Sequence, residues 1–172
     1  GWLHIGGNML YLWVFGDNVE DVLGKAKFII FYLVSGIAAL ALQIAVDPSS
    51  RVPTIGASGA IAGVLGAYLV LYPRSMITTV IFFGYFIRMV PVPALLLLGI
   101  WFVMQFFSGV ASLGASTEGG VAYFAHLGGF GAGVGLIFIG VMGTSGGKSA
   151  VGMALPVGKV AKVAQVAGKL GK

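Results

Sequence analysis

Five long apolar blocks, separated by short polar stretches, limit most strongly what this chain can fold into. They are roughly 15 to 21 residues long, close to the length of helix that crosses ~30 Å of hydrocarbon. Hydrophobic residues make up 58% of the chain and charged residues only 9%, far from the balance of a soluble domain. We therefore expect an all-α, polytopic membrane bundle whose helices cover residues 2–16, 28–46, 56–72, 92–110 and 122–142.

Basic residues lie at the ends of these blocks and give the chain a net charge of +5. A nucleic-acid surface would instead interleave them with aromatic residues in one patch, so we expect membrane lipid, and no nucleic acid, as a partner. Cytoplasmic loops are enriched in lysine and arginine. With the C-terminus in the cytoplasm, five spans leave Arg51 outside and place these residues inside: Lys25, Lys27, Arg74, Arg88, Lys148, Lys159, Lys162, Lys169 and Lys172.

Two segments do not fit the pattern of spanning helices. Residues 76–91 are apolar but short, carry Arg88 and end at prolines, so we expect them to lie at the membrane interface without crossing. Residues 144–172 form a basic low-complexity tail of Gly, Ala, Val and Lys. This tail is either disordered or a helix resting on anionic lipid. The sequence thus predicts one membrane domain, residues 1–143, followed by the tail.

Polar side chains inside membrane spans are costly, so each needs a reason to be there. The predicted spans contain few of them: His4, Asn8, Ser35, Gln43, Ser58, Gln105, Ser108 and His126. The chain has two histidines and no cysteine, and no carboxylate falls within a span. These residues make a poor zinc site. No phosphate loop or cofactor motif is visible, and we expect neither a metal nor a cofactor.

Ser58 and His126 are the candidates for chemistry. Each has a structural explanation, because serine beside glycine is common in packed membrane helices and a buried histidine can hydrogen-bond a neighbouring helix. Both, however, lie within about two turns of the N-terminal ends of helices predicted to run from the outside inwards, and therefore share a depth. Gly56 and Gly59 flank the serine and leave room for a substrate backbone, while free N–H groups of the helix start can face an oxyanion.

Small residues on the third and fifth predicted helices favour close packing of their backbones. Gly59, Gly63 and Gly66 recur three and four apart, and Gly129 and Gly133 form a G-x-x-x-G pattern. Such packing would bring the serine hydroxyl within reach of the imidazole. His4 and Asn8 are spaced i and i+4, which places both on one face of the first helix near its outer end.

Three motifs in order resemble the rhomboid family of intramembrane serine proteases. They are His4-Ile5-Gly6-Gly7-Asn8, then Gly56-Ala57-Ser58-Gly59-Ala60-Ile61-Ala62-Gly63, and then Ala125-His126-Leu127-Gly128-Gly129 with Gly133. The resemblance covers about residues 1–143, and residues 15–21 are similar to the stretch after the second helix in bacterial members. It implies that Ser58 is the nucleophile, that His126 is its general base, and that His4 and Asn8 belong to the oxyanion site.

The chain departs from that family in two respects. The family has six core helices and this sequence shows five, so we expect the first helix and its outer loop to lie upstream of Gly1 or to be missing. Some members place a tyrosine one turn after the serine to stack on the histidine. Here that position is Ala62, so something else must orient His126. Only Glu118 could supply an acid partner, which favours a Ser-His dyad over a triad.

The sequence thus predicts an intramembrane serine endopeptidase that cleaves transmembrane segments of membrane proteins. We expect a multi-pass protein of the bacterial inner membrane, with the site opening to the outer side. One alternative is a catalytically inactive relative that binds transmembrane helices. The other is a small transporter or channel in which His4 and His126 relay protons.

Overall fold

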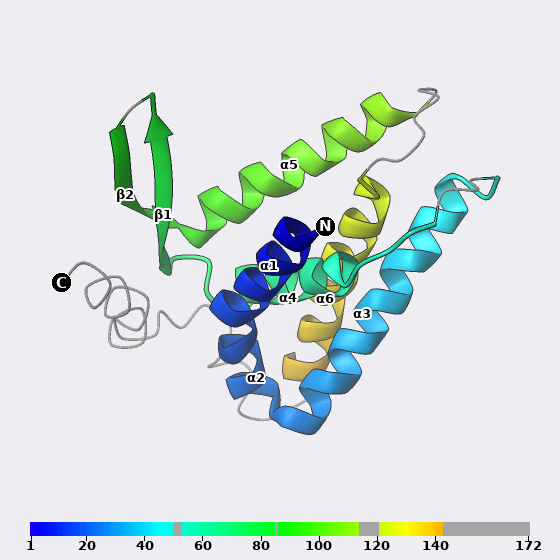
Figure 1. Ribbon diagram of the computed structural model, residues 1–172. Coiled ribbons are helices and arrows are strands. Elements are labelled where there is room, and N and C mark those ends of the chain that lie inside the picture. The colour runs from blue at the N-terminus through cyan, green and yellow to red at the C-terminus, as the bar shows by residue number, and fades with distance from the viewer. Residues whose placement is uncertain (50–52, 85, 114–120, 143–172) are drawn as a thin grey trace.

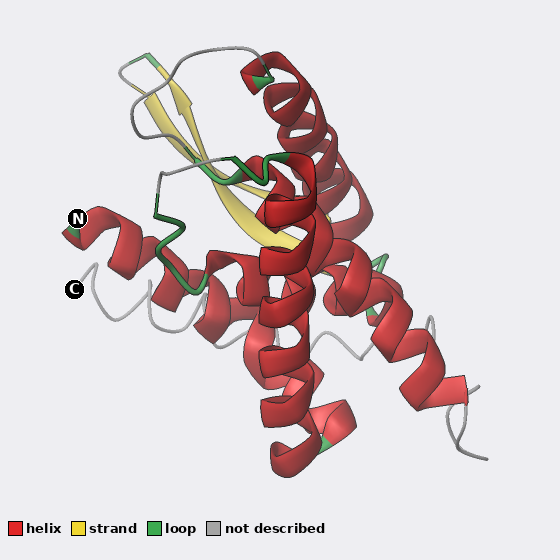
Figure 2. Ribbon diagram, turned by 90° about the vertical axis from the view of Figure 1, so that its right-hand side faces the viewer, coloured by secondary structure: helices red, strands yellow, loops and turns green. Residues whose placement is uncertain are grey.

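The computed structural model describes residues 1–49, 53–84, 86–113 and 121–142 (Figure 1). Helices dominate this part of the chain, and its strands form a single hairpin (Figure 2). The elements are α1 (Trp2–Tyr11), a π-helical turn η1 (Leu12–Gly16), α2 (Asp17–Leu23), α3 (Lys25–Val46), α4 (Ser58–Leu71), β1 (Met76–Phe83), β2 (Phe86–Pro93), α5 (Ala94–Ser112) and α6 (Tyr123–Met142). The predicted helical membrane bundle is confirmed, whereas the basic tail, Arg51 and Glu118 lie outside the described residues.

Helix α4 forms the centre of the bundle. Eleven of its fourteen residues are buried, and it packs mainly against α6 and α3. The sequence explains this position, because a helix of glycine, alanine and aliphatic residues has no polar face to turn outwards. The other helices that carry candidate site residues, α1 and α6, both contact α4.

Helices α3, α5 and α6 are each long and apolar enough to cross a membrane. Their outer faces expose large apolar side chains, such as Ile37 on α3 and Phe107 on α5, as lipid-facing helices do. The chain is an integral membrane protein. The first predicted span is helical over its whole length, as α1 and η1, and continues into the polar helix α2. The third predicted span is the helix α4, which has only fourteen residues.

An aromatic cluster fixes the N-terminal helices against α4. The ring of Phe15 meets that of Tyr68 edge-on, with centroids 4.9 Å apart, and the Tyr72 hydroxyl donates to the carbonyl of Asn18 at 3.2 Å. Phe15 belongs to η1, where the helix widens locally. These contacts hold η1 and α2 against the C-terminal end of α4. Because α1 leads directly into η1, they help to determine where His4 lies.

Residues 76–93 differ from the all-α expectation, because they form an antiparallel hairpin. Met76 pairs with Pro93 and Phe83 with Phe86, and Gly84 at the turn has a φ of 57°, which favours glycine. The run of β-branched and aromatic residues is the physical reason for the strands. The chain leaves and returns at the same end of the hairpin. Since an open two-stranded hairpin has unpaired backbone edges that hydrocarbon does not tolerate, this geometry agrees with a segment that does not cross the membrane.

Candidate active site

Ser58 is the first residue of α4 and follows an irregular stretch, residues 53–57. Gly56 has a φ of 136°, a conformation that side chains rarely adopt, and it turns the backbone into the helix. No side chain caps the helix start, and the N–H of Ile61 is bonded to the carbonyl of Ala57 at 3.0 Å. The N–H groups of Ser58, Gly59 and Ala60 therefore have no intrahelical acceptor. All three residues line a cavity.

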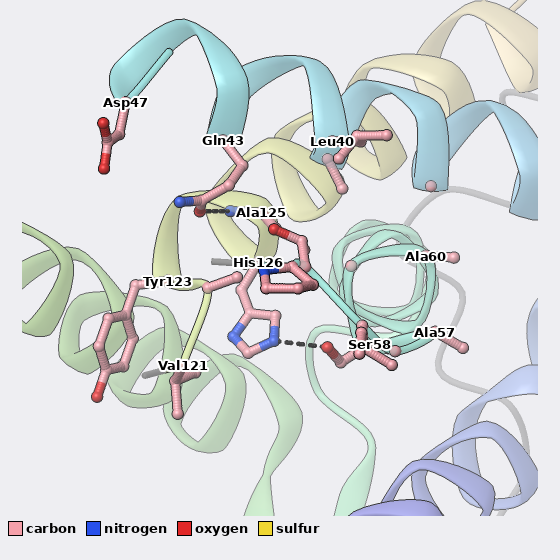
Figure 3. Close-up of a pocket in the computed structure, with 18 of the residues that line it drawn as sticks. Leu40, Gln43, Asp47, Ala57, Ser58, Ala60, Val121, Tyr123, Ala125 and His126 are labelled. Carbon is pink, nitrogen blue, oxygen red and sulfur yellow. Dashed lines mark hydrogen bonds between the residues drawn. The ribbon is translucent and has the colours of Figure 1, made fainter. Parts of the chain in front are cut away.

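The side chains of Ser58 and His126 meet in this cavity (Figure 3). The serine Oγ lies 2.9 Å from Nε2 of the imidazole, a normal hydrogen-bond length. The two residues are 68 positions apart in the sequence and come from α4 and α6. A hydroxyl hydrogen-bonded to an imidazole nitrogen is the arrangement by which a serine is activated as a nucleophile.

Two side chains of α5 contact the rest of the imidazole. Oε1 of Gln105 lies 2.7 Å from Nδ1 of His126, and the ring of Trp101 lies beside the imidazole with centroids 5.9 Å apart. In the sequence, Gln105 stands out only as a polar residue in a predicted span, and neither contact was predicted. The i, i+4 spacing of Trp101 and Gln105 was the available signal, since it places both on one face of α5.

A glutamine of α3 fixes the beginning of α6. Oε1 of Gln43 accepts the backbone N–H of Ala125 at 3.1 Å (Figure 3). Ala125 immediately precedes His126, and its N–H belongs to the first turn of α6, which has no intrahelical acceptors of its own. The hydrogen bond therefore ties the turn that carries the histidine to α3. Which helix Gln43 would contact could not be predicted from the sequence.

Close contact between the α4 and α6 backbones brings the two side chains together. A Cβ added at Gly129 would collide with the carbonyl oxygen of Gly59, and one added at Gly133 would collide with that of Gly63. Gly59 also packs on α3, where an added Cβ would lie 2.6 Å from that of Ala39. Gly59 thus lines the cavity and also serves as a packing residue between three helices.

The structure places His4 and Asn8 differently. His4 lines the cavity, and a Cβ added at Gly56 would lie 3.0 Å from its Nε2 and 3.8 Å from Oγ of Ser58. The His4 imidazole and the serine hydroxyl therefore border the same glycine. Asn8, one turn further along α1, is half-buried and is not among the described residues that line the cavity.

The Rhomboid domain family model matches residues 1–143 of this sequence. The chain belongs to the rhomboid family. The hydrogen-bonded Ser58 and His126, the cavity and the close α4–α6 pair all lie within the matched residues of this rhomboid chain.

Curated relatives agree with this membership. The chain is 36% identical over 133 residues to "Rhomboid protein 1, mitochondrial" of Saccharomyces cerevisiae, a match that covers 73% of this chain and 34% of the relative. It is 42% identical over 78 residues to "Rhomboid protease GluP" of Bacillus subtilis, covering 44% of this chain and 15% of the relative. To the "Putative rhomboid protease YdcA" of the same species it is 37% identical over 79 residues, covering 45% and 39%. The chain thus spans about a third of the length of the yeast relative and less than half of either bacterial relative. No solved structure matches at comparable significance.

The cavity of this rhomboid is wide, with a volume of about 1740 Å³. Pockets for small molecules usually measure about 300 to 1,000 Å³, so this one has room for a stretch of polypeptide. Its walls come from α1, α3, α4, α5 and the start of α6. In the described part of the chain, no group of three or more His, Cys, Asp or Glu side chains is placed to hold a metal ion.

Proposed function

We propose that this rhomboid chain is the core of an intramembrane serine endopeptidase that cleaves transmembrane segments of membrane proteins. The observation that carries the proposal is the 2.9 Å contact between Oγ of Ser58 and Nε2 of His126 at the uncapped start of α4. In the proposed roles, Ser58 is the nucleophile and His126 is the general base.

The reaction follows from these positions. Nε2 of His126 takes the proton of Ser58 as Oγ attacks a substrate carbonyl carbon, and the carbonyl oxygen becomes an oxyanion. The donors proposed to stabilise that charge are the free N–H groups at the start of α4 and Nε2 of His4, which borders Gly56. His126 then gives its proton to the leaving amine. Water, deprotonated by His126, then attacks the acyl-enzyme. As the ester bond breaks, His126 returns the proton to Oγ, which releases the second product and restores Ser58.

The histidine works as part of a dyad in this proposal. Its Nδ1 faces the neutral amide of Gln105, where a triad would have a carboxylate. Asp47 also lines the cavity, but its Oδ1 accepts the hydroxyl of Ser49 at 3.1 Å. Glu118, which the sequence left open as an acid partner, lies outside the described residues.

The length of α4 explains how water can reach such a site. Fourteen residues at 1.5 Å each make a helix of about 21 Å, roughly 9 Å short of the ~30 Å hydrocarbon layer. With the Pro73-Arg74 end of α4 at one membrane surface, Ser58 lies below the other. The cavity, which reaches polar residues such as Asp47 and Ser49, then connects the serine to the aqueous side and supplies water for hydrolysis.

The oxyanion role proposed for His4 and Asn8 can be tested by single substitutions. His4→Ala and Asn8→Ala are each expected to lower turnover of a transmembrane substrate by about 10² to 10³-fold, the usual loss of one oxyanion donor. Both variants are expected to retain labelling of Ser58 by a fluorophosphonate, because the dyad is intact. Turnover of Asn8→Ala at the wild-type rate would assign Asn8 to packing, in keeping with its position outside the cavity lining.

We further propose a bacterial inner membrane location, a cytoplasmic C-terminus and a site that opens to the outer side. The charge distribution supports this orientation, and both Ser58 and His126 lie near the start of their helices. The chain has no cysteine, so single cysteines report accessibility cleanly. Cysteine at position 118 is expected to react with an impermeant thiol reagent added to intact cells, and cysteines at 74 and 148 only after permeabilisation. Labelling of position 148 from outside would overturn the orientation.

One reconstituted system separates the proposal from its two alternatives. In liposomes that contain the protein and a panel of single-span membrane proteins, an endopeptidase releases fragments that require Ser58. An inactive relative would bind the spans without cutting them, and a channel or transporter would show ion or solute flux that does not depend on Ser58. Binding or flux without any fragment would reject the proposed function.

A further inference from the structure

We infer that Gln105 is a positioning residue that holds the Nδ1–H tautomer of His126, so that Nε2 is free to take the proton of Ser58. This inference rests on the proposed function. Gln105 lies on α5 behind the imidazole and is not among the described residues that line the cavity. It therefore acts through His126 and not on a substrate.

The hydrogen-bonding capacity of the two groups determines the tautomer. An amide oxygen accepts hydrogen bonds and cannot donate them, so the 2.7 Å contact between Oε1 of Gln105 and Nδ1 of His126 is a hydrogen bond only when Nδ1 carries the proton. A neutral imidazole has one N–H, which leaves a lone pair on Nε2. That lone pair faces Oγ of Ser58 at 2.9 Å. In the other tautomer, lone pairs of Nδ1 and Oε1 would face each other and Nε2 could not act as a base.

Packing of Trp101 between α5 and α6 helps to hold Gln105 opposite the imidazole of His126. Trp101 lies one turn before Gln105 on α5 and contacts both the imidazole and the ring of Phe130, with centroids 5.9 and 6.0 Å apart. Phe130 lies one turn after His126 on α6. The two helices thus present matched pairs of side chains to each other. Since α4 offers only the methyl group of Ala62 one turn after the serine, α5 supplies the groups that orient the histidine.

The tautomer can be measured directly by nitrogen NMR on protein labelled with 15N-histidine and purified without a histidine tag. The chain has two histidines, so the His4→Ala variant assigns the His126 signals. The wild-type protein and Gln105→Glu are expected to show protonated Nδ1 and unprotonated Nε2 at neutral pH. Gln105→Leu, which keeps the volume but removes the acceptor, is expected to show protonated Nε2 in a large share of molecules. Protonated Nε2 in the wild-type protein, or an unchanged tautomer in Gln105→Leu, would overturn the inference.

The rate of fluorophosphonate labelling of Ser58 gives a second readout. Gln105→Leu is expected to slow labelling by about 10 to 10²-fold, as when a metal-binding histidine loses the group that orients it, and less than the ~10⁴-fold cost of losing a triad aspartate. Gln105→Glu is expected to restore most of the rate. Met104→Leu, at the exposed neighbouring position on α5, serves as the matched control and is expected to label like the wild type.

The outcomes separate this inference from the proposed function. If the wild-type protein labels at Ser58 and Gln105→Leu labels equally fast, the inference fails and the proposed function stands. If the wild-type protein does not label at all, the proposed function fails, and the NMR measurement still decides whether Gln105 sets the tautomer of His126.

Discussion

Alanine at Ser58, or at His126, is expected to lower cleavage of a transmembrane substrate by about 10⁴-fold or more while the protein stays folded. The reason is that each change removes one half of a nucleophile–base pair whose members act as a unit. Neither side chain contributes much packing, because both are only half-buried at the edge of the cavity. The measurement is release of substrate fragments in liposomes, with circular dichroism to verify that helical content is retained.

The double variant provides the internal control for this prediction. Once Ser58 is absent there is no hydroxyl for His126 to deprotonate, so the double variant is expected to be no slower than either single one. Losses that add up in the double variant would show that the two residues act separately. Cleavage at the wild-type rate in either single variant would exclude the dyad.

Gly133→Ala is expected to lower the free energy of unfolding strongly. The added methyl group would collide with the carbonyl oxygen of Gly63, and backbone cannot move aside as a flexible side chain can. Overpacking a core usually costs about 1 to 3 kcal/mol, and a clash with backbone lies at or above the upper end, so we expect about 3 kcal/mol. The free energy of unfolding can be measured by denaturant titration in detergent micelles, followed by circular dichroism.

Two glycines on the same helix are matched controls for this substitution. A Cβ at Gly131 or Gly135 would meet nothing within 4 Å, and both positions are exposed. Gly131→Ala and Gly135→Ala are therefore expected to unfold at the wild-type denaturant concentration or slightly above it, since alanine favours the helix more than glycine does. Equal stability of Gly133→Ala and these two controls would contradict the close packing of α4 against α6.

Much of the fold could be predicted because apolar length and periodicity are properties of the sequence itself. The expected helix at residues 28–46 is α3, Lys25–Val46, and the one at 122–142 is α6, Tyr123–Met142. The hairpin was missed, although the β-branched residues Thr78, Thr79 and Val80 ahead of Gly84 were a usable signal. Hydropathy could not distinguish this strand pair from an interfacial segment, since both are short and apolar.

The candidate site was predictable where its residues form local motifs and unpredictable where it depends on how helices cross. The G-A-S-G start of α4 and the glycine spacing on α6 pointed to Ser58 and His126, and the structure places their side chains in contact. The partners of Gln105 and Gln43 were not predictable, because the angle at which α5 and α3 meet α6 decides them. The roles of all these residues stay predictions.

Mapping a fluorophosphonate adduct is a direct test of the proposed Ser58–His126 dyad, because it requires no knowledge of the natural substrate. The protein is treated with the probe in detergent or liposomes, digested, and analysed by mass spectrometry. We predict one adduct on Oγ of Ser58, present in the wild-type protein and absent from His126→Ala, since the hydroxyl reacts only with its base in place. An unmodified Ser58 in the folded wild-type protein, or a Ser58 adduct that forms equally fast without His126, would contradict the dyad.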